Sequence, residues 1–291
     1  MAWVGKARAR AKINLTLHIL GRRDNGYHDL ESLVTFAAFG DELTLVEGSQ
    51  LALSLSGPQS AALKNDADNH ILKAAQALTA RIKNLRVGKF HLVKSLPLAS
   101  GMGGGSADAA AALRLLAKLN HLSLDDPRVR EAALETGADV PVCLESRSRM
   151  MRGIGETLDA PIALPQLFAL VVNPLKTSAT PDVFAKIGLA RGETHKAPPH
   201  PHFTDKMSDD TFLSTLHTGR NDMEAAAITL QPVIGEVKTA VSSLPSCRLT
   251  RMSGSGATVF GLFPSCRATA AAARLLKREH PEWWIKPTLF R

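Results

Sequence analysis

Apolar and polar residues alternate along several stretches of the chain, as in β-strands whose successive side chains point to opposite faces of a sheet. Asp24-Asn25-Gly26 and Gly40-Asp41 predict turns between such stretches, because Asn and Gly tolerate positive φ. The strands expected on this basis cover about residues 7–20, 30–39, 43–46, 90–94, 167–172, 247–252 and 257–263, with a last strand near Trp284.

Other stretches repeat apolar residues every three or four positions, which is the period of a helix buried on one face. Asp68 or Asn69 is expected to cap the first of these helices, and Pro127 is tolerated in the first turn of a later one. Residues 190–210 are polar and rich in Pro, His and Gly, which predicts an exposed loop. The predicted helices cover about residues 70–82, 104–119, 127–137, 222–230, 233–243 and 266–278.

The length of the chain, 291 residues, exceeds the usual size of a single domain, so two domains are expected. Gly153, Gly155, Pro161 and Pro165 cluster where the boundary between them is predicted. The expected organisation is an α+β protein with an N-terminal domain at residues 1–155 and a C-terminal domain at residues 160–291.

The composition is that of an ordinary globular protein, with 45% apolar and 21% charged residues. No apolar run is long enough to span a bilayer, and Asn14, Thr16 and His18 interrupt the apolar residues that follow the basic N-terminus. The three cysteines form no CxxC pair, which is typical of reduced thiols in a cytoplasm. We therefore expect a cytoplasmic protein with no membrane partner.

The net charge of +8 is the one unusual bulk property. A basic surface can attract nucleic acid, anionic lipid or a polyanionic small substrate. Lys and Arg are spread along the chain without a block of five or six, and aromatic residues make up only 5%. This distribution favours one anion site over a nucleic-acid face, although a basic nucleic-acid-binding protein stays an alternative.

The segment from Pro97 to Ser106 is the most informative in the sequence, because glycines precede a predicted helix. Backbone N–H groups of such a loop converge on an anion, and the helix dipole adds positive charge there. The Ser106 hydroxyl can reach a phosphate or a magnesium-bound oxygen. The segment matches neither the Walker A pattern nor the dinucleotide fingerprint. A surface turn with a helix cap is the alternative to a phosphate site built from Pro97, Ser100, Gly101, Met102, Gly103, Gly104, Gly105 and Ser106.

This glycine loop resembles the second motif of the GHMP kinases, a superfamily of small-molecule kinases. Lys12-Ile13-Asn14-Leu15 resembles their first motif, and the segment from Met252 to Ala257 resembles the third. AKINLTLHILGRRDNGYHDLESL, GMGGGSADA and GADVPV together are similar to the family that phosphorylates 4-diphosphocytidyl-2-C-methyl-D-erythritol (CDP-methylerythritol). The resemblance runs from Ala9 to about Phe263.

The resemblance implies a two-domain GHMP kinase fold, with a ribosomal protein S5 domain 2-like N-terminal domain and a ferredoxin-like C-terminal domain. It implies phosphorylation of the 2-hydroxyl of CDP-methylerythritol by ATP in the non-mevalonate isoprenoid pathway. It also implies Mg²⁺, although no dense carboxylate cluster predicts a protein metal site. CDP-methylerythritol and ATP are the expected small-molecule partners of a monomer or weak dimer that binds no nucleic acid. A kinase for mevalonate, homoserine or a sugar remains an alternative.

Lys12 and Asp139 match the catalytic pair of that family. From the residues alone, Lys12 is as well explained as a solvated strand residue, and Asp139 as a helix cap. The resemblance implies that Asp139 accepts the proton of the substrate hydroxyl while Lys12 keeps Asp139 ionised and stabilises the transferring phosphoryl group.

Tyr27 and His28 follow the predicted Asn-Gly turn, and Tyr27 is the only tyrosine of the chain. An aromatic ring there can stack on a cytosine while His28 binds the edge of the base. The resemblance supplies Phe184 as the second stacking residue and places Asn14 and Thr180, with Asp139, near the polyol and phosphates of the substrate.

On the nucleotide side, Asn69 and Lys94 match positions near adenosine, and Asn69 has a competing role as a helix cap. The third motif is expected to pack against the glycine loop through Ser253, Gly254, Ser255 and Gly256. His195, His200 and His202 are irregularly spaced between prolines, so they are expected to be solvated and to bind no metal.

Overall fold

A computed structural model describes residues 2–61, 63 and 68–290. They form two compact units, each made of several chain segments. The first unit takes residues 1–12, 39–98 and 103–146, and the second takes residues 13–38, 99–102 and 147–291. Strands β1 (Val4–Asn14) and β3 (His28–Gly48) supply residues to both units. The sequence-based boundary between residues 155 and 160 stays a prediction.

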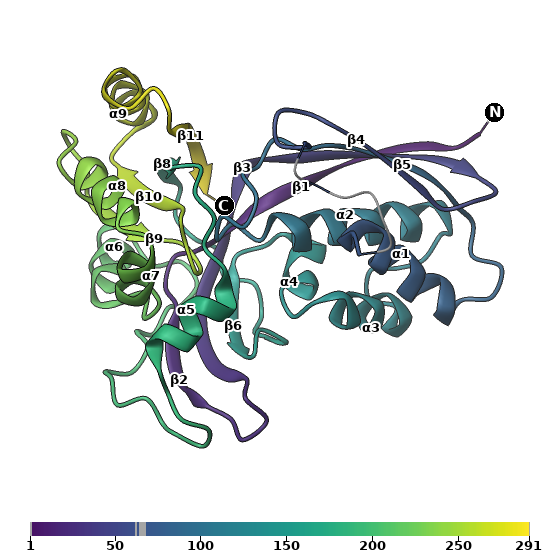
Figure 1. The fold of residues 1–291 in the computed structure, drawn as a ribbon, viewed down its shortest axis with the longest axis horizontal. Helices are drawn as coiled ribbons and strands as arrows, with labels where there is room; N and C mark the ends of the chain where they lie inside the picture. Colours follow the sequence, from purple (N-terminus) through teal and green to yellow (C-terminus); the bar gives the residue numbers. More distant parts are fainter. Residues whose placement is uncertain (1, 62, 64–67, 291) are drawn as a thin grey trace. The chain divides into compact units, whose positions relative to one another are not determined.

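The first unit is a sheet with helices on one face (Figure 1). Strand β5 (Val87–Val93) pairs in parallel with β4 (Ala52–Ser56) and antiparallel with β3, where Glu42 lies opposite Val93. Strand β1 pairs with β3. The alanine-rich run of α2 is almost wholly buried, because small side chains let neighbouring helices approach closely. The helices are α1 (His70–Arg81), α2 (Gly104–Leu119), α3 (Pro127–Thr136) and α4 (Val140–Glu145).

The turn predicted at Gly40-Asp41 is wrong, because β3 continues through it for 21 residues. Gly40 allows a neighbouring strand to come close: a Cβ built there would lie 2.0 Å from the carbonyl oxygen of Ala9. Asp41 is fully buried, and its Oδ1 accepts hydrogen bonds from the backbone N–H groups of Ser95 and Leu96. Both residues therefore serve tertiary packing, not chain reversal.

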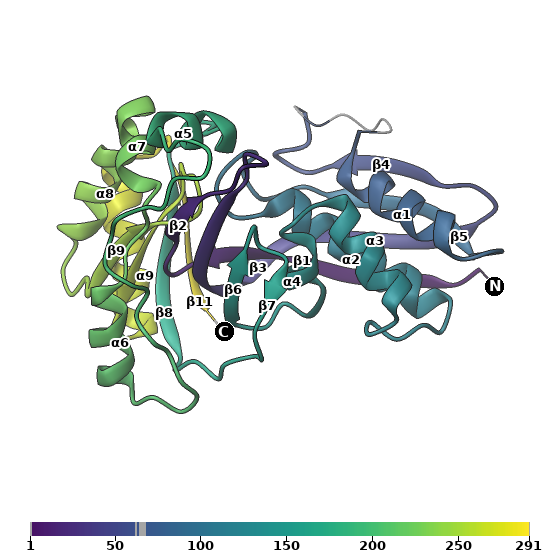
Figure 2. The same cartoon turned by 90° about the horizontal axis from the view of Figure 1, so that it is seen from below.

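The second unit contains a four-stranded antiparallel sheet in the order β11-β8-β10-β9. Helices α8 (Val233–Ser242) and α9 (Cys266–Glu279) pack on it (Figure 2). Chain order and strand order together are those of a ferredoxin-like fold, which confirms the expected C-terminal fold. The strands are β8 (Leu167–Asn173), β9 (Leu249–Met252), β10 (Val259–Phe263) and β11 (Trp284–Phe290).

Of the remaining strands of the second unit, β2 and β6 pair with the N-terminal part of β3, and β7 pairs with β6. Three further helices lie between β8 and α8 in the chain. Most of these elements have no prediction from the sequence, because short elements carry weak periodicity. No helix in the described part of the chain is both long and apolar enough to cross a bilayer. These elements are β2 (His18–Arg22), β6 (Arg149–Gly153), β7 (Thr157–Leu158), α5 (Thr180–Ile187), α6 (Asp209–Thr218) and α7 (Glu224–Leu230).

The single strand predicted over residues 7–20 is two strands, β1 and β2. Between them the backbone N–H of Leu15 bonds to the carbonyl of Leu33, and the N–H of Leu17 bonds to the carbonyl of Arg220. The alternating pattern therefore continues while the backbone changes its hydrogen-bonding partner.

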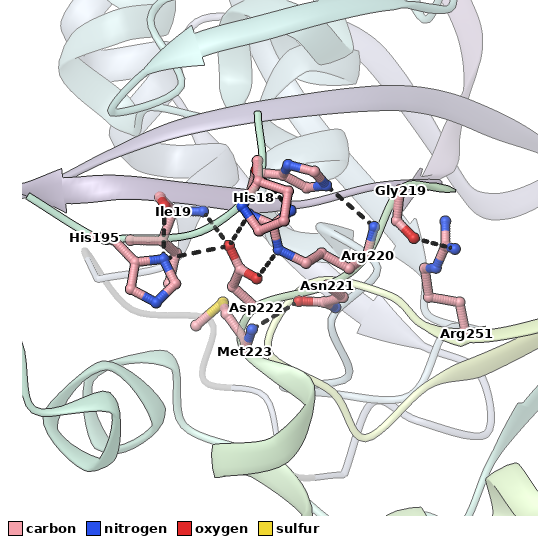
Figure 3. Close-up of polar contacts among 10 residues, drawn as sticks. His18, Ile19, His195, Gly219, Arg220, Asn221, Asp222, Met223 and Arg251 are labelled. Carbon is pink, nitrogen blue, oxygen red and sulfur yellow. Dashed lines mark hydrogen bonds and ion pairs between the residues drawn. The ribbon is translucent and has the colours of Figure 1, made fainter. Parts of the chain in front are cut away.

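The polar segment 190–210 has no helix or strand before α6 begins at Asp209, as predicted, but it is not a free loop. Its backbone pairs with β2 through Arg22 N to Glu193 O, Gly192 N to Arg22 O and His195 N to Leu20 O, each 2.8 Å. His195 Nδ1 also lies 3.0 Å from Ile19 O and 3.8 Å from Asp222 Oδ2 (Figure 3).

The prediction that the three histidines of this segment are solvated holds only for His202, which is exposed. His200 is half-buried, and its Nε2 lies 2.6 Å from Thr16 Oγ1. Its ring packs edge-on against the fully buried His18, with ring centroids 4.5 Å apart. This packing could not be predicted from the sequence, because the proline-rich segment has neither helical nor strand periodicity.

Both rings of the His18–His200 pair favour the neutral state. Burial lowers the pKa of each histidine to about 4. The nearby Arg220 and Arg251 guanidinium groups add to the effect on both rings, Arg152 adds to it at His200, and Asp222 opposes it at His18. The backbone N–H of Arg220 donates to His18 Nε2 over 3.1 Å, which uses that nitrogen as an acceptor (Figure 3).

We expect the free energy of unfolding to fall as pH drops from about 6.5 to about 4. In this range His18 and His200 bind protons in the unfolded chain but stay neutral in the folded protein. Urea unfolding midpoints measured across this range test the expectation. His200→Gln keeps a hydrogen-bonding group for Thr16 without titrating, so it should flatten the pH dependence, whereas His202→Gln should not. Equal slopes in wild type and both variants would contradict the assignment.

Candidate active site

Lys12 and Asp139, which the sequence could not place together, form an ion pair in the first unit. Lys12 Nζ lies 2.7 Å from Asp139 Oδ2, with the lysine side chain 4% exposed and the carboxylate 36% exposed. Asp139 occupies the N-cap position of α4, but its side chain makes no capping hydrogen bond. Asp139 is therefore a helix cap by position but not through its side chain, and its partly exposed carboxylate lies beside a buried ammonium.

The first turn of α2 carries the second half of the glycine loop past this lysine. A Cβ built on Gly103 would lie 3.3 Å from both Cβ and Cε of Lys12, and Gly103 has φ of 60°. No side chain in the described chain caps α2, whose first helical bond runs from Ala107 N to Gly103 O. The N–H groups of the first turn therefore keep the free donors and the positive dipole end that attract anions.

A buried ion cluster lies beneath the same turn. Lys94 Nζ donates to Asp41 Oδ2 at 2.7 Å and to Asp108 Oδ2 at 2.5 Å, and none of the three side chains is more than 5% exposed. A Cβ built on Gly104 would lie 3.2 Å from Lys94 Nζ. The cluster thus joins β3, the end of β5 and the start of α2. Sequence reasoning missed Asp41 and Asp108; the signal for Asp108 was an acid within an alanine run.

The charged groups of this cluster shift one another's pKa values. Burial raises the pKa of Asp108 to about 7. Attraction to Lys94 opposes this rise, and repulsion from Asp41 adds to it. Burial alone would lower the pKa of Lys94, but the two carboxylates raise it above its ordinary value. Asp108 Oδ1 is buried and has no hydrogen-bond partner in the described chain. Two of the three N–H donors of the Lys94 ammonium are therefore used within this cluster.

The third motif packs against the first half of the glycine loop inside the second unit, as predicted. Ser253 Oγ donates to Gly101 O over 2.9 Å and accepts from Asn14 N over 3.1 Å. A Cβ on Gly101 would lie 2.2 Å from Ser253 O, and one on Gly254 would lie 2.9 Å from Gly101 O. Only glycines permit this approach of two backbones. Ser255 Oγ bonds to Thr180 Oγ1 at 2.8 Å.

His28 and Phe184 form a stacked pair, with ring centroids 4.1 Å apart and an interplanar angle of 11°. Burial and the charge of Arg22 lower the pKa of His28, which favours the neutral form of its imidazole. His28 Nε2 is buried without a hydrogen-bond partner in the described residues. Tyr27, one residue earlier, is 58% exposed. Tyr27 therefore offers an exposed ring to a planar ligand, and His28 Nε2 is an unsatisfied hydrogen-bonding group below the surface.

Three other residues predicted for the site have structural partners. Asn69 caps α1, with Oδ1 accepting from Ile71 N at 3.0 Å, which confirms its helix-cap role. Asn14 is buried and donates from Nδ2 to Ser32 Oγ at 2.7 Å. Ser100 accepts a backbone bond from Thr258 N at its carbonyl, 3.1 Å away. Their ligand-binding roles stay predictions.

Known proteins resemble the chain over nearly its whole length. The model of the N-terminal domain of GHMP kinases matches residues 69–147, and that of the C-terminal domain matches residues 210–284. A curated 4-diphosphocytidyl-2-C-methyl-D-erythritol kinase of Methylobacterium radiotolerans is 52% identical over 285 residues, or 98% of each chain. The chain belongs to the GHMP kinase family. The glycine loop of this GHMP kinase lies within the N-terminal match.

Other relatives of this GHMP kinase have either the same name as the first or the same fold. A kinase of the same name from Rhodopseudomonas palustris is 52% identical over 95% of this chain and 92% of its own. A solved 4-(cytidine 5'-diphospho)-2C-methyl-D-erythritol kinase superposes with a TM-score of 0.76 at 30% identity, covering 98% of this chain and 99% of that one. Homoserine kinase from Cytophaga hutchinsonii has a TM-score of 0.69 at 18% identity over 98% and 94% of the two chains, a likeness of fold alone. The GHMP kinase fold predicted from the sequence is confirmed.

Proposed function

We propose that this GHMP kinase transfers the γ-phosphoryl group of ATP to the 2-hydroxyl of CDP-methylerythritol, giving the 2-phosphate and ADP in the non-mevalonate isoprenoid pathway. The observation that carries the proposal is the sequence identity of 52% with kinases of that name over nearly the whole chain. The Lys12–Asp139 pair and the uncapped start of α2 supply chemistry that fits it.

In the proposed reaction, a bond forms between the acceptor oxygen and the γ-phosphorus while the bond from that phosphorus to the β,γ-bridging oxygen breaks. Asp139 accepts the hydroxyl proton, for which its half-open carboxylate is suited. Lys12 keeps Asp139 ionised and stabilises the negative charge of the transferring phosphoryl group. ADP leaves with the electron pair of the broken bond.

The base of the substrate is recognised by the residues around the His28–Phe184 stack. The neutral imidazole of His28 offers its unpartnered Nε2 to the polar edge of cytosine. Tyr27 and Phe184 supply aromatic faces for the base. Asn14 and Thr180 complete the proposed contacts with the polyol and phosphates.

ATP is proposed to place its phosphates on the backbone from Ser100 to Ser106 and its adenosine near Asn69, Lys94 and Pro97. The described residues contain no group of three His, Cys, Asp or Glu side chains that could hold a metal ion. Mg²⁺ would therefore be held by the ATP phosphates with the Ser106 hydroxyl, and it would neutralise charge on the phosphate oxygens. We also propose that the protein is cytoplasmic and that it is a monomer or a weak dimer.

One coupled assay tests the acceptor. ADP release is measured with CDP-methylerythritol, unsubstituted methylerythritol, mevalonate and homoserine. We expect turnover with CDP-methylerythritol alone among them, because the cytidine group supplies binding energy that positions the hydroxyl. Equal activity on methylerythritol with and without the cytidine group would overturn the assignment.

Tyr27→Ala is expected to raise the KM for CDP-methylerythritol roughly 5- to 150-fold, which corresponds to the loss of about 1–3 kcal/mol from one stacked base. The fold should persist, because the ring is 58% exposed. Tyr27→Phe keeps the aromatic face and serves as the matched control. A KM that is the same in Tyr27→Ala and wild type would exclude stacking by this residue.

A further inference from the structure

Two arginine side chains meet over the turn that precedes Tyr27. A Cβ built on Gly26 would lie 3.7 Å from Arg191 Nη2 and 4.0 Å from Arg22 Nη2. Both guanidinium groups therefore reach the same face of this turn. Arg191 belongs to the polar segment 190–210, for which the sequence indicated no role.

Neither guanidinium group forms an ion pair with a carboxylate in the described chain. Arg22 uses Nη1 and Nε on backbone carbonyls, those of Leu189 at 2.9 Å and Gly26 at 3.3 Å. Two like charges held close together repel one another unless an anion lies between them. Arg23 shows the contrast, because its guanidinium contacts the carboxylates of Asp29 and Glu156.

The carboxylates of the same region form no ion pair with Arg22 or Arg191 in the described chain. Glu193 Oε2 accepts from the backbone N–H of Ala190 at 2.7 Å. Asp24 turns toward Gly192, where its Oδ1 would lie 3.1 Å from an added Cβ. The positive charge of Arg22 and Arg191 is thus not neutralised by a direct partner.

Backbone pairing holds the two arginines at this turn. Arg22 N donates to Glu193 O, and Gly192 N donates to Arg22 O, both at 2.8 Å. These bonds are made by the two residues that follow Arg191, and they hold this part of the chain beside β2. Arg191 is itself exposed, so its side chain is available to a ligand.

The arginines also adjoin the His28–Phe184 stack. Tyr27 and His28 directly follow Gly26, and the charge of Arg22 is felt at the imidazole of His28. Phe184 lies in the last turn of α5, and Arg191 follows four residues after the end of that helix. An anion bound by the two guanidinium groups would therefore lie near a planar group that stacks on the exposed ring of Tyr27.

We propose that Arg22 and Arg191 form an anion subsite that binds the diphosphate of a cytidine diphosphate substrate. This inference rests on the proposed function and adds to it the residues that recognise the charged link between nucleoside and polyol. Guanidinium groups suit this task because their planar N–H pairs match phosphate oxygens in bidentate geometry. The subsite discriminates between substrates with and without the diphosphate.

The experiment compares two probes, CDP and cytidine, whose only difference is the diphosphate. Dissociation constants are measured by calorimetry for wild type and Arg191→Gln, together with the KM values for CDP-methylerythritol and ATP. Arg191→Lys keeps the charge without the fork, and Lys196→Gln removes an exposed charge from the same segment as a matched control. Arg191 is exposed, so the fold should survive its replacement.

We expect Arg191→Gln to weaken CDP binding roughly 10- to 100-fold, the worth of lost charge-assisted hydrogen bonds. Cytidine binding and the KM for ATP should stay unchanged, while the KM for CDP-methylerythritol rises in step with the dissociation constant of CDP. Arg191→Lys should fall between Arg191→Gln and wild type, and Lys196→Gln should match wild type.

An unchanged ratio of CDP to cytidine affinity in Arg191→Gln would overturn the subsite while leaving the proposed function intact. A wild type that binds neither probe and does not turn over CDP-methylerythritol would overturn the proposed function, and the subsite with it. Equal weakening of CDP and cytidine would show that Arg191 only shapes the turn, which also contradicts the subsite.

Discussion

Asp139→Asn is expected to lower kcat by roughly 10²- to 10⁴-fold, the span usually contributed by a positioned acid or base. The amide keeps the shape of the carboxylate but cannot accept the hydroxyl proton. It can still hydrogen-bond the hydroxyl and Lys12, so the KM for the acceptor should change little. Single-turnover measurement with saturating ATP isolates this step from product release.

The partner of Asp139 provides an internal test of the same mechanism. Lys12→Met removes the ammonium that lies 2.7 Å from the carboxylate, so it should also lower kcat. The losses should not add in the double variant if the two residues act as a unit. Asp126→Asn makes the same chemical change at a helix cap in α3 and should leave kcat unchanged.

The contrary outcome is informative. A folded Asp139→Asn variant within about fivefold of the wild-type rate would lie far outside the effect of a lost general base. Asp139 would then orient the hydroxyl without accepting its proton, and additive losses with Lys12→Met would point the same way. Transfer would depend on positioning of the two substrates alone.

Lys94→Met is expected to lower the free energy of unfolding by about 3–5 kcal/mol, the usual cost of removing one partner from a buried ion cluster. The variant leaves Asp41 and Asp108 facing each other with no countercharge, and neither can reach water. Urea unfolding at neutral pH measures the loss. Lys73→Met, which breaks an exposed pair with Asp68, is the matched control and should change stability far less.

A loss below about 1 kcal/mol in Lys94→Met would show that the cluster carries no net ionic stabilisation. Nucleotide titration of the folded variant adds a second readout. The first turn of α2 packs against Lys94 at Gly104. Weaker ATP binding is therefore expected even if Lys94 never touches adenosine. Unchanged ATP affinity would remove Lys94 from the nucleotide site altogether.

Local features of this protein were predictable from the sequence where one short segment determines them. The glycines of residues 101–105 predicted an anion-binding helix start because their backbone conformations depend on the segment itself. Helices α1, α2 and α9 followed from their apolar spacing. The packing of the third motif on the glycine loop was likewise confirmed, although that prediction depended on a family resemblance.

Predictions failed where a residue's role depends on distant partners. Gly40 and Asp41 have the composition of a turn, yet their chain runs straight through because a neighbouring strand and a buried lysine require them. His200 lies among prolines, and only the folded chain shows that His18 and Thr16 receive it.

The sequence by itself determined the family, the glycine loop and the identity of the candidate catalytic residues, because these depend on residue type and local order. Only the tertiary structure brought Lys12 to Asp139, enclosed Lys94 between two carboxylates and set Arg22 beside Arg191. The physical reason is that charge interactions depend on distance and burial, and strand pairing and helix packing determine both.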